Sequence, residues 1–278
     1  MKLFRFGPLG SEKPGVIDSS GTHRDLSSVV HELDPTTIAA GLIEGLKDID
    51  FAMLPKVPDN ARIGPCLATT GNFLAIGLNY VEHARESNAP LPIEPIIFSK
   101  APSCIVGPND DIVLPRGSRK TDWEVELAFV IGKRAHYVSE GDALSYVMGY
   151  CVCNDVSERE FQLERGGQWM KGKCAPSFGP IGPYLVTADE IPDPQTLPLW
   201  LEVNGERLQD SATSDMIFPI RKIVSYLSEF MVLMPGDLVT TGTPSGVGLR
   251  MRPERYLRHG DTVRLSVEGL GTQTQRVV

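Results

Sequence analysis

Hydrophobic residues in most of this chain form short runs separated by glycine, proline and aspartate, a pattern typical of β-strands. One run, Leu199–Val203, precedes Asn204-Gly205, a pair that readily adopts the positive φ angles of a type I′ turn, so we expect a β-hairpin there. The strands expected after residue 100 are Trp123–Ile131, Gly149–Cys153, Leu199–Val203, Leu238–Thr241 and Thr262–Val267.

Helical periodicity is found in fewer places. In Arg221–Phe230 the apolar residues repeat at three- and four-residue spacing, which predicts a helix with one buried face. Two more helices are expected at Asn79–Ser87 and Ser157–Arg165. Strands and helices do not alternate regularly and no GxGxxG turn follows a strand, which argues against a dinucleotide-binding α/β sheet. The larger part of the chain is therefore predicted to be mainly β with a few helices.

The first 65 residues differ in texture from the rest. Two short strands are expected at Lys2–Phe6 and Gly15–Asp18, and a short helix at Pro35–Leu46. The prolines and polar residues of Leu54–Asn60 block a helix and favour a turn, which is typical of a linker. We therefore predict a small α/β N-terminal domain over residues 1–65 and a larger domain over residues 66–278.

Composition narrows the classes of function. The chain has 278 residues and a net charge of −8, a balance that argues against nucleic acid or anionic lipid as a partner. No segment approaches the roughly 18 apolar residues of a membrane helix, and no secretory signal is expected. The five cysteines lack the paired spacing of zinc sites, so we expect reduced, mostly buried thiols and a cytoplasmic protein.

Carboxylates gather near the strand Trp123–Ile131. With a side-chain period of two, Glu124 and Glu126 share one face, which becomes apolar within two residues and is expected to enter the core. With Asp155, which follows Gly149–Cys153, they form an oxygen site suited to Mg²⁺ or Mn²⁺, with Ca²⁺ a further option. The alternative is a half-exposed strand with solvated glutamates and an Asp155 that caps the next helix.

A histidine–glutamate pair is the first candidate for catalysis. His83 and Glu86 are three residues apart on a predicted helix, so they lie on one face. The carboxylate could hold the imidazole in one tautomer, which suits a general base that activates water. An ion pair on the surface of an amphipathic helix fits the same spacing.

Other polar residues could bind a substrate. Arg159 and Gln162 share a face of the helix expected after Asp155 and could hold a carboxylate, although a solvated helix face would look the same. Lys173 lies in a glycine-rich loop, where a lysine is usually a surface charge. The glycines of Thr241–Gly248 permit close approach of the backbone, whose amides could bind an anion.

Several motifs follow one another in a fixed order along the chain. They are Ile76-Gly77-Leu78-Asn79-Tyr80 with His83 and Glu86, Pro95, Phe98 and Lys100 with Gly107-Pro108, Glu124-Val125-Glu126-Leu127, Asn154-Asp155-Val156-Ser157 with Arg159, Lys173, Val203-Asn204-Gly205-Glu206, Pro235-Gly236-Asp237, and Gly242-Thr243-Pro244-Ser245-Gly246-Val247-Gly248. This series resembles the fumarylacetoacetate hydrolase family over roughly residues 70–278. The first 65 residues resemble the small N-terminal domain of the longer bacterial members.

The resemblance implies a mixed β-sandwich roll and a homodimer. The site residues that it implies are the metal ligands Glu124, Glu126 and Asp155, the water-activating pair His83 and Glu86, the catalytic Lys173, and the substrate-binding residues Arg159, Gln162 and Thr243. Animal-type members carry a further acidic ligand upstream of the catalytic histidine, whereas Gly71–Val81 contains no acid. This departure favours the bacterial branch.

The resemblance also implies a reaction: Mg²⁺-dependent hydrolysis of a C–C bond in a small 2-oxo acid. The loop at Gln168-Trp169 resembles members that cleave 2,4-diketo-3-deoxy sugar acids of the L-rhamnonate and L-fuconate type, giving pyruvate and a small hydroxy acid, which makes Gln168 a further substrate-binding candidate. Other subgroups are isomerases, decarboxylases, fumarylpyruvate (acylpyruvate) hydrolases and ureidoglycolate lyases. A remote alternative is a non-enzymatic β module with a structural Ca²⁺ ion, which would not need the His83–Glu86 pair.

Overall fold

The computed structural model describes residues 1–278. Its largest sheet contains β1 (Lys2–Phe6), β2 (Lys13–Ile17), β3 (His23–Asp25), β4 (Ile63–Gly64), β5 (Phe73–Gly77), β6 (Ile96–Lys100), β9 (Val125–Ile131), β10 (Val147–Asn154), β13 (Leu185–Thr187) and β16 (Leu238–Thr240). The strand order is β3-β2-β1-β13-β10-β9-β16-β5-β6, with β4 paired to β1. This sheet is mixed, because β16 runs parallel to β5 whereas the neighbouring pairs are antiparallel.

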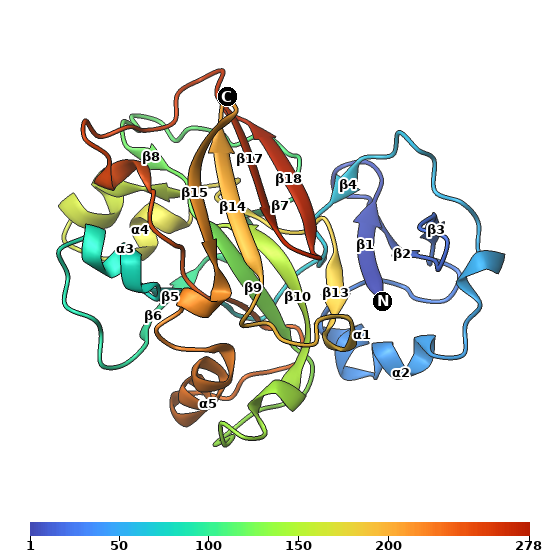
Figure 1. Cartoon of the computed structure of the whole chain (residues 1–278). Helices are drawn as coiled ribbons and strands as arrows, with labels where there is room; N and C mark the ends of the chain where they lie inside the picture. The colour runs from blue at the N-terminus through green and yellow to red at the C-terminus, as the bar shows by residue number, and fades with distance from the viewer.

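A second sheet packs against the middle of the first. It contains β14 (Pro198–Val203), β15 (Glu206–Ala212), β17 (Thr262–Val267) and β18 (Gly271–Arg276) in the order β15-β14-β17-β18. Its strands lie over β9 and β10, in which every residue is buried (Figure 1). Two short pairs complete the β-structure: β8 (Thr121–Asp122) with β11 (Ser157–Glu158), and β7 (Ile105–Val106) with β12 (Gly179–Pro180). The predicted mixed β-sandwich roll is confirmed.

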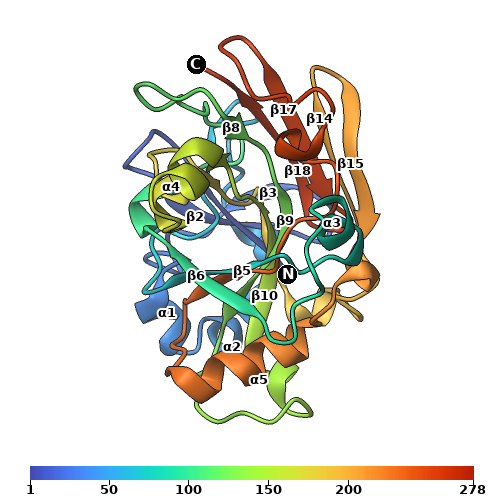
Figure 2. The ribbon, with the colours of Figure 1, turned by 90° about the vertical axis from the view of Figure 1, so that its left-hand side faces the viewer.

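Helical elements are short and lie around the sheets. They are α1 (Pro35–Ala39), α2 (Leu42–Leu46), α3 (Val81–Glu86), α4 (Met170–Lys173), α5 (Ile220–Phe230), η1 (Phe51–Met53), η2 (Pro102–Cys104), η3 (Ala143–Tyr146), the π-helical turn η4 (Glu160–Glu164), η5 (Ala188–Glu190), η6 (Thr213–Asp215) and η7 (Gly248–Arg250). Figure 2 shows α3 and α4 on the side of the molecule that faces the viewer, with β5 and β6 below them. None of the helices has the length and apolar character needed to cross a membrane.

The first 65 residues join the rest through strand pairing. Leu3 in β1 lies opposite Leu185 in β13, so the large sheet continues across the predicted boundary. Apolar side chains from both parts belong to one cluster of 56 buried residues. In the segment predicted as a linker, Val57 is buried against Phe4 and Phe6. The division into two domains at residue 65 stays a prediction.

Several local predictions are confirmed and two are wrong. The hairpin forms at Asn204-Gly205, whose φ angles are 53° and 81°, and the four cysteines other than Cys174 are buried. The helix predicted over Pro35–Leu46 is two helices, α1 and α2, because Gly41 between them has a φ of 89°. The helix predicted over Ser157–Arg165 begins instead as the strand β11, which pairs with β8 before the π-helical turn η4.

Candidate active site

The three carboxylates predicted as metal ligands converge beside the central strands. Glu124 immediately precedes β9, Glu126 lies within it, and Asp155 follows β10. The antiparallel pairing places Cys153 opposite Glu126, and the backbone N–H of Asp155 donates to the carbonyl of Glu124 at 2.9 Å. One oxygen from each carboxylate lies within 4.8 Å of the others, and all three residues are buried. The alternative of solvated glutamates on a half-exposed strand is therefore wrong.

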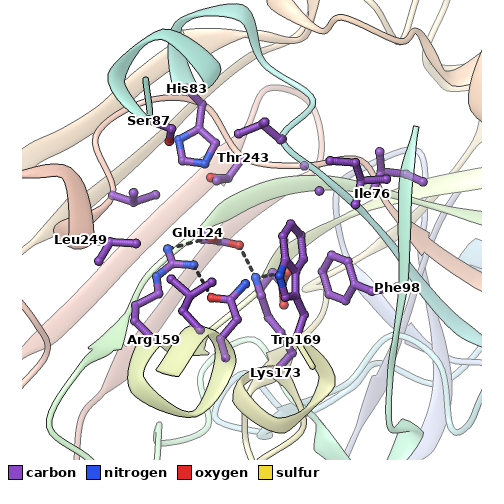
Figure 3. A pocket seen from close by; sticks show the side chains of 18 of the residues that line it. Ile76, His83, Ser87, Phe98, Glu124, Arg159, Trp169, Lys173, Thr243 and Leu249 are labelled. Atoms are coloured by element: carbon purple, nitrogen blue, oxygen red, sulfur yellow. Dashed lines mark hydrogen bonds and ion pairs between the residues drawn. The ribbon is translucent and has the colours of Figure 1, made fainter. Parts of the chain in front are cut away.

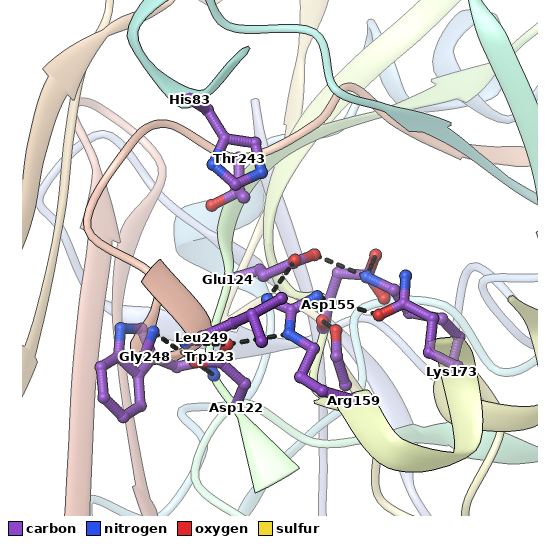
Figure 4. Close-up of polar contacts among 12 residues, drawn as sticks. His83, Asp122, Trp123, Glu124, Asp155, Arg159, Lys173, Thr243, Gly248 and Leu249 are labelled. Carbon is purple, nitrogen blue, oxygen red and sulfur yellow. Dashed lines mark hydrogen bonds and ion pairs between the residues drawn. The ribbon is translucent and has the colours of Figure 1, made fainter. Parts of the chain in front are cut away.

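Two of these carboxylates are paired with buried cations. Nζ of Lys173 lies 2.6 Å from Glu124 Oε2 and 2.6 Å from Asp155 Oδ2 (Figure 4). Nη2 of Arg159 lies 2.7 Å from Glu124 Oε1. Burial alone would raise the pKa of Glu124, but the charges of Lys173 and Arg159 outweigh it and lower that pKa to about 2. Glu124 is therefore an anion at neutral pH.

Glu126 is different, because no cation pairs with it. Its carboxylate accepts one hydrogen bond, from the backbone N–H of Gly242 at 2.9 Å. Burial, together with the charges of Asp155 and Glu124, raises the pKa of Glu126 well above its usual range. The buried carboxylate of Glu126 therefore has no positively charged partner within the protein. Three convergent carboxylates, one of them uncompensated, fit a hard divalent cation such as Mg²⁺ or Mn²⁺.

The predicted catalytic pair forms on α3. Nδ1 of His83 lies 2.7 Å from Oε1 of Glu86, and Glu86 also accepts the backbone N–H of Gly246, 3.1 Å from Oε2. A side chain at position 246 would place its Cβ 1.9 Å from the carbonyl oxygen of Leu208, so only glycine lets the loop reach Glu86. The imidazole is thus oriented with Nε2 free, and it faces Glu124 across the site (Figure 4). This geometry favours a positioned base over a surface ion pair.

A cavity of ≈ 230 Å³ is lined by His83 and by the three carboxylates of the triad. Figure 3 shows His83 and Thr243 on one side of Glu124, with Arg159 and Lys173 on the other. One flank is apolar and is formed by Ile76, Phe98 and Trp169. The rings of Phe98 and Trp169 make an edge contact with centroids 5.4 Å apart. A Cβ at Gly77 would lie 2.3 Å from the Trp169 ring, so this glycine makes room for the aromatic wall.

Three of the four predicted substrate-binding residues line this cavity. They are Arg159, Gln162 and Thr243. The Thr243 hydroxyl donates to the carbonyl of Val125 at 2.9 Å, so its proton is already used by the protein. Gln162 Oε1 accepts from Arg159 Nη1 at 3.1 Å, which leaves the amide NH₂ of Gln162 as a donor for a ligand. Gln168 is exposed and does not line the cavity; its neighbour Trp169 does.

Comparisons with known proteins identify the family. Residues 72–278 match the family model described as "Fumarylacetoacetate (FAA) hydrolase C-terminal". The chain belongs to the fumarylacetoacetate hydrolase family. A relative from Burkholderia orbicola (strain MC0-3), which carries the name "Putative hydrolase", is 55% identical over 277 residues, covering 99% of this chain and 98% of the relative. The resemblance found in the sequence motifs is confirmed, and the protein is an enzyme of this family.

Solved structures of the family share the whole fold. The fumarylacetoacetate hydrolase from psychrophilic Exiguobacterium antarcticum superposes with a TM-score of 0.90 at 35% identity, covering 100% of this chain and 99% of that one. A maleylpyruvate hydrolase from Sphingobium sp. SYK-6, in complex with manganese (II) ion and pyruvate, gives 0.80 at 27% identity, with coverage of 100% and 99%. The similarity therefore extends over the N-terminal residues as well as the matched domain.

Sequence reasoning missed two buried residues that hold the site of this family member together. Asp122 accepts from Arg159 Nε at 2.8 Å and from the backbone N–H groups of Gly248 and Leu249 at 2.7 and 3.0 Å. It therefore connects the arginine beside the triad to the turn η7. Its place two residues before Glu124, on the same side of the alternating pattern, was the available signal.

The second missed residue is Lys100, at the end of β6. Its Nζ lies 2.5 Å from Asp155 Oδ1 and 2.6 Å from the backbone carbonyl of Lys173. Burial alone would lower the pKa of Lys100, but the charge of Asp155 outweighs it and the pKa is raised. Lys100 thus stays charged and fixes both Asp155 and the end of α4. Its position was part of the resemblance to the family, but nothing in the local pattern showed its partner.

Proposed function

We propose that this protein catalyses the metal-dependent hydrolysis of a C–C bond in a 2,4-dioxo acid and releases pyruvate. The observation that carries the proposal is a histidine oriented by Glu86 that faces a buried carboxylate triad across a small cavity. A site built only to hold a structural ion would not need a free imidazole nitrogen opposite the ion. The relative that binds manganese and pyruvate adds support from the same family.

Glu124, Glu126 and Asp155 are the residues that would hold the cation. We propose Mg²⁺, with Mn²⁺ and Ca²⁺ as alternatives, because all three donors are carboxylate oxygens. When bound, a divalent cation supplies a Lewis acid that stabilises negative charge developing on the 2-oxo group of the substrate. The positive charges of Lys173 and Arg159 keep Glu124 ionised for that role.

Side chains of the protein supply the general base, the contact to the substrate carboxylate and the stabilisation of the product enolate. Glu86 accepts a hydrogen bond from the Nδ1–H of His83, which leaves Nε2 without a hydrogen, so Nε2 can take a proton from water. The resulting hydroxide attacks the C4 carbonyl, the C3–C4 bond breaks, and C3 is protonated, which gives one acid from the tail and one pyruvate. The NH₂ of Gln162 would bind the C1 carboxylate. Lys173 would stabilise the enolate charge or return the proton to C3.

Two kinds of substrate, which differ in the group attached to the C4 carbonyl (the tail), fit this reaction class. A sugar-acid tail of the L-rhamnonate or L-fuconate type was predicted from the Gln168-Trp169 loop, but only Trp169 of that pair reaches the cavity. An acylpyruvate with an unsaturated tail is the second candidate, because the wall of Ile76, Phe98 and Trp169 is apolar and flat rings suit such a chain. Isomerisation and decarboxylation could use the same site. A homodimer and a cytoplasmic location stay predictions.

One assay tests the proposal. The purified protein, stripped of metal and then given Mg²⁺ or Mn²⁺, is offered 2,4-diketo-3-deoxy-L-rhamnonate, acetylpyruvate, fumarylpyruvate and oxaloacetate, and pyruvate is measured together with the second product. We expect metal-dependent release of pyruvate and a carboxylic acid from at least one dioxo acid. Turnover that persists after complete removal of metal, or decarboxylation of oxaloacetate alone, would contradict the hydrolase proposal.

A further inference from the structure

One cation in the cavity wall has no partner in the protein. Three lysine or arginine residues line the cavity: Arg159, Lys173 and Arg250. Arg159 is paired with Asp122 and Glu124, and Lys173 with Glu124 and Asp155. Nε of Arg250 is buried, yet it has no hydrogen-bond partner, and its guanidinium forms no ion pair. An unpaired guanidinium beside a cavity is a receptor for an anion.

The backbone that carries Arg250 is held firmly. Arg250 is the last residue of η7, whose Gly248 and Leu249 N–H groups donate to Asp122. Its own N–H donates to the carbonyl of Val247 at 3.1 Å, and Arg255 closes the turn by donating to the carbonyl of Gly248 at 3.1 Å. Because the turn is fixed, little backbone freedom is lost when the Arg250 guanidinium binds a carboxylate, which favours specificity.

The position of this turn indicates which part of a substrate it would meet. Leu249 lies on the flank of the cavity opposite Phe98 and away from Lys173 (Figure 3). In the proposed function, the C1 carboxylate of a dioxo acid is bound by the NH₂ group of Gln162. We propose that Arg250 is a specificity-determining residue that binds a second carboxylate, in the tail of the substrate. The enzyme would then prefer dianionic 2,4-dioxo acids, an inference that rests on the proposed function.

Matched substrates and matched variants test this assignment. Fumarylpyruvate carries a tail carboxylate, whereas acetylpyruvate and 2,4-diketo-3-deoxy-L-rhamnonate do not. We expect the wild type to favour fumarylpyruvate in kcat/KM, and Arg250→Gln to reduce that preference by roughly 10- to 100-fold, mainly through KM, as expected for a lost charge pair. Acetylpyruvate turnover should change less than about twofold, and Arg250→Lys should keep part of the preference.

Arg252→Gln is the control. Arg252 lies two residues after Arg250 and carries the same charge, but its side chain is exposed and bonds only to the carbonyl of Met251. It should leave the preference unchanged. Equal losses on both substrates in Arg250→Gln, or a wild-type preference for the sugar acid that Arg250→Gln removes, would overturn the assignment.

A binding measurement separates this inference from the proposed reaction. Fumarylpyruvate and acetylpyruvate are titrated calorimetrically, with Mg²⁺ present, into His83→Ala and into the double variant His83→Ala/Arg250→Gln. Tighter binding of fumarylpyruvate that depends on Arg250 would support the assignment even if the wild type hydrolysed neither acid, a result that would refute only the hydrolase proposal. Identical affinities in the two variants would refute the role of Arg250 itself.

Discussion

The carboxylate triad and the His83–Glu86 pair face one cavity but are anchored in different ways. The triad lies beside β9 and β10, whose residues are all buried, and two of its members, Glu124 and Asp155, are ion-paired with the buried cations Lys100, Lys173 and Arg159. The pair lies on α3, a helix of six residues with one buried side chain. The triad is therefore part of the buried core, whereas the catalytic pair lies on a short helix at the edge of that core.

Hydrogen bonds at both ends of α3 tie it to the rest of the protein. The buried amide of Asn79, just before the helix, donates to the carbonyls of Phe218 and Thr241 at 3.0 and 2.8 Å. Glu86 adds its bonds to Gly246. Within the helix itself only Ala84 is buried, whereas Glu82 and Arg85 are exposed. Mutations in the triad should therefore alter both stability and activity, and mutations in the pair mainly activity.

The largest effect is expected for Asp155→Asn. The change removes a ligand charge and leaves Lys100 and Lys173 without the carboxylate that lies 2.5 and 2.6 Å from them. Activity and metal binding should be mostly lost, and the free energy of unfolding should fall by about 3–5 kcal/mol, as for other broken buried ion pairs. Denaturant unfolding and metal titration measure the two effects. A variant as stable as the wild type would show that these ion pairs contribute little.

Glu126→Gln should lose activity equally but change stability in the opposite direction. The folded state raises the pKa of Glu126, so its ionisation destabilises the metal-free protein once the pH exceeds the ordinary glutamate pKa. Removing that charge should stabilise the metal-free protein at neutral pH by on the order of 1 kcal/mol. The gain in stability should shrink as the pH falls toward 4, because Glu126 then becomes protonated in the unfolded protein as well as in the folded protein. Chemical unfolding of metal-free protein at several pH values tests this, and a neutral-pH loss of stability would contradict it.

His83→Ala comes next. Without the base that Glu86 orients, kcat should fall by a factor on the order of 10²–10⁴. Because the imidazole lies on α3 and bonds only to Glu86, the free energy of unfolding should change by less than about 0.5 kcal/mol and metal affinity should be kept. Glu86→Gln should be milder or comparable. Near wild-type hydrolysis by His83→Ala would place the base elsewhere.

How far the sequence predicts this site follows from the same comparison. The strand alternation predicts that Glu124 and Glu126 share a face, and the three-residue spacing predicts the His83–Glu86 contact, because both patterns are local. The pairing of Lys100 with Asp155 joins residues 55 positions apart, and it depends on how β6 and β10 lie in the sheet. No local pattern contains that information.

The misplaced helices have a local cause and a distant one. Gly41 interrupts the helix predicted at Pro35–Leu46 through its own left-handed conformation, which the sequence allowed but did not require. Ser157 and Glu158 begin a segment that was predicted to be helical, yet they pair as a strand with Asp122 and Thr121. Tertiary pairing overrode local preference there, and it brought Asp122 to Arg159.

Asp122→Asn gives the smallest of the expected losses. An asparagine oxygen can still accept a backbone N–H of η7, but the charge that pairs with Arg159 at 2.8 Å is gone. Arg159 would then keep only its ion pair with Glu124, so its guanidinium should shift toward the triad. We expect metal affinity and kcat/KM each to fall by roughly 10- to 100-fold, the usual effect of changing a residue that orients a metal site. Asp111→Asn, which affects an exposed pair with Arg276, is the control. If Asp122→Asn lowered the melting temperature but left metal affinity and kcat/KM at wild-type values, Asp122 would stabilise the fold without positioning the site.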